Sequence, residues 1–104
     1  MKESDWRLFK KIKEKAIEHF CQRILDEFEV VVKNKKEHAH KRYLLLYKLV
    51  QNRDKQMQLL FDVHSRSQAP IQLTAIRSEG LADESLLSKL SDEFLEATDP
   101  KLYS

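Results

Sequence analysis

The residues of this chain whose types could do chemistry are four histidines, one cysteine and scattered carboxylates. His38 and His40 form the densest histidine pair, and an H-x-H pair binds a metal when it lies on a strand, whose alternate residues share one face. On a helix, residues two apart point about 200° apart, so the same pair cannot converge. Lys35, Lys36 and Lys41 add positive charge nearby. The sequence therefore predicts no metal site.

Catalysis needs a set of convergent groups, and none can be assigned. Cys21 and His19 have the same unfavourable spacing of two, and Cys21 is expected to be a small core residue rather than a nucleophile. Arg53 and Asp54 are typical of a surface ion pair. Gly80 is the single glycine of the chain, so there is no glycine-rich phosphate loop. We therefore expect a protein that is not an enzyme and carries no cofactor.

The elements that must position these residues are helices, because β-hairpins and strand bulges draw on glycine's freedom at positive φ and this chain has one glycine in 104 residues. Hydrophobic residues at 41% and charged residues at 35% are typical of a folded domain. We expect one helical domain over residues 1–104, with frayed ends at 1–4 and 98–104. The sequence has no membrane-spanning stretch and one unpaired cysteine, which favours the cytoplasm.

The first helix is predicted over residues 5–33, with Ser4 as its N-cap and Asn34 at its end. Its apolar residues recur every three or four positions and so define one face. They are Phe9, Ile12, Ala16, Phe20, Ile24, Phe28 and Val31.

The second helix is predicted from about residue 37 to 64, again with apolar residues at helical spacing. The polar residues Asn52 to Asp54 interrupt this pattern, so the helix is either continuous or kinked near Asn52. Two helices of about 40 Å each predict an elongated molecule.

Shorter helices are predicted for the remainder. Pro70 suits the first turn of a third helix, and Gly80 suits the position just after its end. Asp83 and Ser91 are N-cap candidates for two further short helices, the first reaching Leu90. The predicted fold is an all-α, elongated bundle of two long helices with two or three short C-terminal ones.

The second helix has more apolar surface than a small bundle can cover. Leu44 to Tyr47 are consecutive apolar residues that point around most of the helix, and Leu49 widens this coverage. The sequence therefore predicts a protein-interaction module that forms a homodimer or binds another protein. The candidate interaction surface is Leu45, Leu49, Leu86 and Leu87.

A nucleic-acid contact is the alternative. The segment 33–55 has eight basic residues against two acidic ones, a net charge of +6. The candidate phosphate-contacting residues are Lys35, Lys36, Lys41, Arg42 and Lys48. Tyr43 and Tyr47 lie on the apolar stripe, so we expect them to pack inward rather than to stack on bases.

Several segments carry a resemblance. They are FCQRILDE at residues 20–27, RY-x-x-L at 42–46, Arg53–Asp54, SRSQA at 65–69 and QL-x-x-I at 72–76. Together they resemble a group of small uncharacterised bacterial proteins, some of which are associated with integron mobile gene cassettes. The resemblance implies a bacterial protein of one helical domain, and it supplies no activity and no site residues.

Overall fold

The computed structural model describes residues 1–103 as helices and connecting turns, with no strand among them. The helices are α1 (Glu3–Lys33), α2 (Ala39–Phe61), α3 (Ala69–Ser78), α4 (Glu84–Leu87), α5 (Asp92–Ala97) and the 3-10 helix η1 (Pro100–Tyr103). The molecule measures 53 × 26 × 23 Å. The all-α fold and the elongated shape predicted from the sequence are therefore confirmed.

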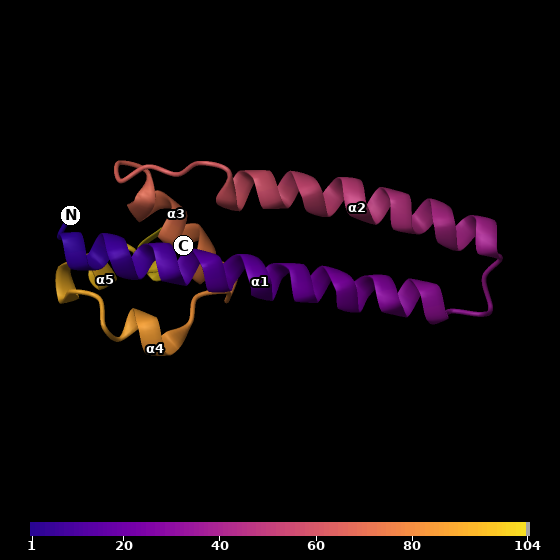
Figure 1. The fold of residues 1–104 in the computed structure, drawn as a ribbon, viewed down its shortest axis with the longest axis horizontal. Coiled ribbons are helices and arrows are strands. Elements are labelled where there is room, and N and C mark those ends of the chain that lie inside the picture. The colour runs from indigo at the N-terminus through magenta and orange to yellow at the C-terminus, as the bar shows by residue number, and fades with distance from the viewer. Residues whose placement is uncertain (104) are drawn as a thin grey trace.

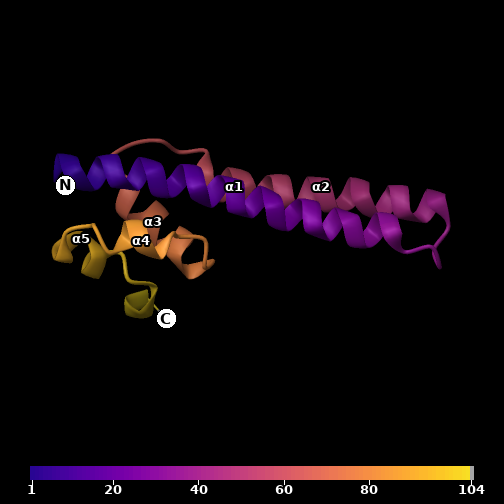
Figure 2. The ribbon, with the colours of Figure 1, turned by 60° about the horizontal axis from the view of Figure 1, so that its bottom comes forward.

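Helices α1 and α2 form an antiparallel hairpin along the whole length of the molecule (Figure 1). The three shorter helices gather beside the N-terminal half of α1, and the rest of the hairpin extends beyond them (Figure 2). The molecule thus has two parts. We call the part that contains α3–α5 the body, and the projecting hairpin, residues 21–60, the arm.

The core lies in the body, where the N-terminal half of α1 packs against the shorter helices. Phe9, Ile12, Leu73 and Ile76 are fully buried. The core also includes Trp6, Ala16, Phe20, Phe61, Ala69, Leu81, Leu86, Leu87, Leu90 and Phe94. The apolar stripe of α1 is therefore buried as far as Phe20 and only half-buried beyond it.

The end of α3 is set by Gly80, which has a φ of 68°. The Gly80 N–H donates to the carbonyl of Arg77 and the Leu81 N–H donates to that of Ile76. These two bonds form a Schellman motif, whose left-handed residue is most often glycine. The predicted position of Gly80 just beyond the helix is confirmed.

Side-chain caps begin the two short helices that follow. Asp83 accepts a hydrogen bond from the Leu86 N–H, and Ser91 accepts one from the Phe94 N–H. Asp5, which is 2% exposed, accepts bonds from both the backbone N–H and the hydroxyl of Ser91, at 2.8 and 2.6 Å. This contact joins the first turn of α1 to the start of α5.

Two long polar side chains satisfy the carboxyl end of α2. Gln72 Nε2 donates to the carbonyls of Leu60 and Val63, at 3.0 and 2.7 Å. Lys13 Nζ donates to the same Val63 carbonyl at 2.8 Å. Because the last carbonyls of a helix have no partner within it, these contacts fix the point where the chain leaves α2.

Three sequence-based expectations need correction. Ser4 is not the N-cap, because α1 begins at Glu3 and Lys2 takes the capping position. The segment 98–104 was expected to fray, but Thr98 is fully buried and η1 follows it. Ser104 lies outside the described residues. The second helix ends at Phe61 rather than near residue 64, and it runs without a break through Asn52.

Candidate protein-interaction surface

The arm holds no buried side chain: within residues 21–60 every residue is partly or fully exposed. Two helices alone enclose only a thin seam, because each can bury only the strip that faces the other. The buried residues of the hairpin end at Phe20 and Phe61, whose rings meet edge to face with 6.0 Å between their centroids. Beyond this pair the arm has no core of its own.

Polar contacts hold the two helices of the arm together. Arg53 donates to both carboxylate oxygens of Glu27, with Nη2 at 2.7 Å and Nε at 3.1 Å. This bidentate pair raises the pKa of Arg53 through its hydrogen bonds with Glu27. At the far end, Arg42 donates to the carbonyls of Val32 and Glu37, at 2.6 and 3.2 Å. The seam thus combines these charged side chains with half-buried apolar ones such as Ile24, Leu46 and Met57.

Many large apolar side chains of the arm face solvent. They are Leu25, Val30, Val32, Tyr43, Leu44, Leu45, Tyr47, Val50 and Leu59. Single exposed apolar residues are normal on a protein surface, but a contiguous set is typical of an interaction site. Which of these residues share a face therefore decides what the arm can do.

The bidentate pair marks the direction in which each helix faces the other. Each residue lies about 100° further around the helix axis than the residue before it. With Glu27 set at 0°, Leu25, Phe28 and Val32 lie at angles of about 100° to 160° around α1. Counted from Arg53 in the same way, Tyr43, Tyr47 and Val50 lie at about 60° to 120°.

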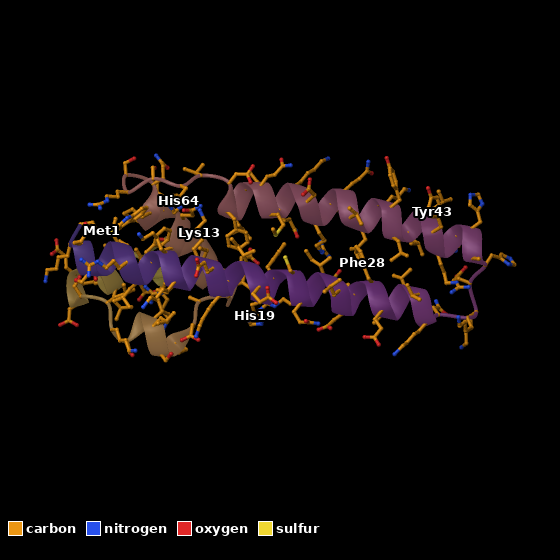
Figure 3. The ribbon with its side chains drawn as sticks, viewed as in Figure 1. Met1, Lys13, His19, Phe28, Tyr43 and His64 are labelled. Carbon is orange, nitrogen blue, oxygen red and sulfur yellow. The ribbon has the colours of Figure 1, made fainter. Side chains whose placement is uncertain are left out.

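Since the helices are antiparallel, the same sense of rotation from the seam leads to the same side of the hairpin. We call this set of six residues, Leu25, Phe28, Val32, Tyr43, Tyr47 and Val50, the outer face. Figure 3 labels Phe28 and Tyr43, one on each helix of the arm. Phe28 is half-buried, and the other five are between 47% and 63% exposed.

Helix α3 ends against the opposite side of the hairpin. Arg23, which lies about 40° from Glu27 in the other sense, donates to the carbonyl of Glu79 at 3.1 Å. Val30 and Leu45 lie on this α3 side and are exposed where the arm extends beyond the body. The outer face is therefore the side of the arm that the body does not approach.

The interaction residues predicted from the sequence are divided by the structure. Leu45 is 43% exposed and Leu49 is half-buried at the edge of the seam, so both lie on the arm. Leu86 and Leu87 are buried in the core of the body. The prediction that Leu86 and Leu87 belong to an exposed interaction surface is therefore wrong.

The candidate phosphate-contacting residues lie at or near the far end of the arm. Lys35 and Lys36 are exposed in the turn between α1 and α2, and Lys48 is exposed on α2. Lys41 pairs with the Glu37 carboxylate at 3.3 Å. Arg42 has a structural role, since its guanidinium closes the turn as described above.

Tyr43 and Tyr47 are 63% and 57% exposed, so the expectation that they pack inward is wrong. The sequence stripe counted them as seam residues, whereas Leu46 and Leu49 take the half-buried positions beside them. Leu25 and Val32 lie off the first stripe and were missed. The signal that could have found them is a second row, with Cys21, Leu25, Phe28 and Val32 at steps of four, three and four.

The other chemically active residues do not gather into a site. In the described part of the chain, no three His, Cys, Asp or Glu side chains come close enough to hold a metal ion. Cys21 is half-buried on the arm rather than in the core.

One polar cluster lies in the body, where Figure 3 labels Lys13 and His64 close together. Lys13 Nζ is 3.5 Å from His64 Nδ1, and the His64 ring lies beside Trp6 with 5.3 Å between centroids. Burial lowers the pKa of the Lys13 ammonium group, and the nearby Asp62 carboxylate partly opposes this shift. Since Lys13 donates to the Val63 carbonyl just after the end of α2, its contact in this cluster holds the chain where it leaves the helix.

Comparisons with protein-family models, with curated proteins and with solved structures find no match. Among the described residues, no helix combines the length and the apolar character that crossing a membrane requires. The geometry of the arm is therefore the main basis for assigning a function.

Proposed function

We propose that this protein is a non-enzymatic helical interaction module that self-associates through its arm. The observation that carries the proposal is that the arm has no buried residue while it exposes a contiguous apolar face. We further propose that it acts in the bacterial cytoplasm, which rests on the sequence alone.

The energetic reason is the hydrophobic effect. Fully burying a valine, leucine or aromatic side chain contributes about 1.5 to 3 kcal/mol relative to leaving it exposed. The arm forgoes most of this contribution as long as it stays uncovered. A partner that covers Tyr47, Leu25 and their neighbours recovers it, whereas most of the large apolar residues of the body are already buried.

Sedimentation equilibrium of the full chain, up to about 100 µM, tests the proposal. We expect reversible association that is lost in the double variant Leu45→Glu/Tyr47→Glu, which places one charge on each side of the arm. Ile71→Glu, at an exposed residue of the body, is the matched control and should associate like the wild type. A wild-type chain that stays monomeric over this range would refute self-association.

A role as an accessory protein that contacts nucleic acid is the second candidate. It is supported by the exposed Lys35 and Lys36 at the end of the arm and by the exposed ring of Tyr43. A gel shift with random duplex and single-stranded DNA at low salt tests it. Salt-dependent binding that Lys35→Gln/Lys36→Gln abolishes would support this role. No shift at low salt would dismiss it.

A further inference from the structure

We infer that the partner of the outer face is a second copy of this chain, and that the two arms pack antiparallel to form a four-helix bundle around a two-fold axis. This inference rests on the proposed function and specifies the face that is used, the occupant and the direction in which it lies.

The outer face is the more apolar side of the arm. Its six members come from both helices and include two tyrosines. On the α3 side, the exposed apolar residues Val30, Leu45 and Leu59 are accompanied by the polar residues Arg23, Asp26 and Asn52. On the outer side, the polar residues Asp54 and Gln58 accompany the six apolar ones. Aromatic residues are enriched at the centres of interfaces, and charged residues are depleted there. The composition of the two sides therefore selects the outer face.

The size of the arm suits a second arm. If the two-fold axis passes near Phe28, the overlap extends from the turn between α1 and α2 to about the level of Phe20. That is about 26 Å at 1.5 Å per residue, across a width of two helices of about 10 Å each. The footprint is then about 500 Å² per copy, or about 1,000 Å² for the pair. This area reaches the lower limit of specific interfaces.

The charges determine the direction. The turn end of the arm is basic, with Lys35 and Lys36 exposed there. On the outer side, the part of α1 that adjoins the base of the arm carries the exposed acid Glu14. An antiparallel arrangement keeps the two basic ends apart and places each on the side of Glu14 of the other copy. A parallel arrangement would place two basic ends side by side, where like charges repel.

Two glutamate substitutions on one helix identify the face. Leu25 lies on the outer face and Val30 on the α3 side, and both are exposed, so neither substitution removes a core contact. In sedimentation equilibrium we expect Leu25→Glu to raise the dissociation constant of the dimer at least about tenfold and Val30→Glu to leave it within about twofold. Circular dichroism checks that both variants keep wild-type helicity. The reverse ranking would overturn the choice of face.

Spin labels determine the direction. The variant Cys21→Ser/Lys36→Cys carries one label per chain at the turn, and double electron–electron resonance measures the distance between the two labels of a dimer. We expect about 25 Å for the antiparallel arrangement, against about 10 to 15 Å for a parallel one.

The outcomes separate the inference from the function on which it rests. A dimer with a short distance between labels overturns the antiparallel direction but leaves self-association intact. A dimer that is insensitive to Leu25→Glu overturns the outer face in the same way. A wild-type chain that remains monomeric refutes both, and specific binding of nucleic acid by that monomer would point to the second candidate function.

Discussion

Replacing Asp5 by alanine tests whether the body depends on the contact between α1 and α5. The Asp5 carboxylate is buried and accepts two hydrogen bonds from Ser91, one from its backbone N–H and one from its hydroxyl. In Asp5→Ala the Ser91 hydroxyl can still cap α5, but the partly buried backbone N–H of Ser91 loses its partner. We therefore expect the variant to fold and to be markedly less stable.

The expected loss follows from these two bonds. A hydrogen bond to a charged group contributes about 1.5 to 3 kcal/mol, so the two bonds give about 3 kcal/mol at the lower end of that range. The entropy of unfolding is about 2.1 cal/mol/K per residue, or about 0.2 kcal/mol/K for the whole chain. The melting temperature should then fall by about 14 °C.

Thermal unfolding followed by circular dichroism measures this fall, at one protein concentration because association raises apparent stability. Asp26→Ala is the matched control on the same helix, since Asp26 is exposed and accepts one bond from Gln22. Its loss should stay below about 0.5 kcal/mol. If Asp5→Ala melted no lower than Asp26→Ala, the contact with Ser91 would not stabilise the body.

Three further substitutions test local features. Gly80→Ala should cost about 1 to 2 kcal/mol in urea unfolding, because the left-handed backbone and not the space around the new Cβ is the obstacle. Burial lowers the pKa of Lys13. Between this lowered pKa and the ordinary lysine pKa of about 10.4, the unfolded chain binds more protons than the folded chain, so the stability of the wild type rises with pH. The free energy of unfolding of Lys13→Met minus that of the wild type should therefore decrease between about pH 7 and about pH 10. Hydrogen bonds from the Ser85 hydroxyl and the Leu86 N–H lower the pKa of Asp83 to about 2. The contribution of Asp83 to the stability of the fold is therefore lost as the pH falls from about 4 through about 2. In an acid titration, Asp83→Asn should lose less stability over this range than the wild type does.

Features that depend on neighbouring residues in the sequence could be predicted. Gly80, Asp83 and Ser91 set helix ends through bonds that span only a few residues, so their roles follow from local chemistry. The continuity of α2 through Asn52 could not be decided from the sequence, because the polar residues there suit either a kink or an exposed stretch of helix.

Features that depend on distant residues could not be predicted. Thr98 is fully buried, and its hydroxyl accepts a hydrogen bond at 2.9 Å from Arg77, which lies 21 residues away. The exposure of Tyr43 and Tyr47 depends on where α3–α5 pack, and a helical stripe does not say which element will cover it. The sequence therefore indicated an excess of apolar surface on the second helix. The face that carries this surface could be identified only from the three-dimensional arrangement.

The body and the arm also differ in how far apart in the sequence their contacting residues lie. The arm closes through residues close in sequence, such as Val32 with Arg42 and Glu27 with Arg53. The body closes through Asp5 and Ser91, which are 86 positions apart. The entropy lost in closing a loop grows with its length, and local contacts form faster than distant ones. Folding that begins at the hairpin turn therefore loses the least loop-closure entropy. The core of the body forms only after the last third of the chain has packed against the start of α1.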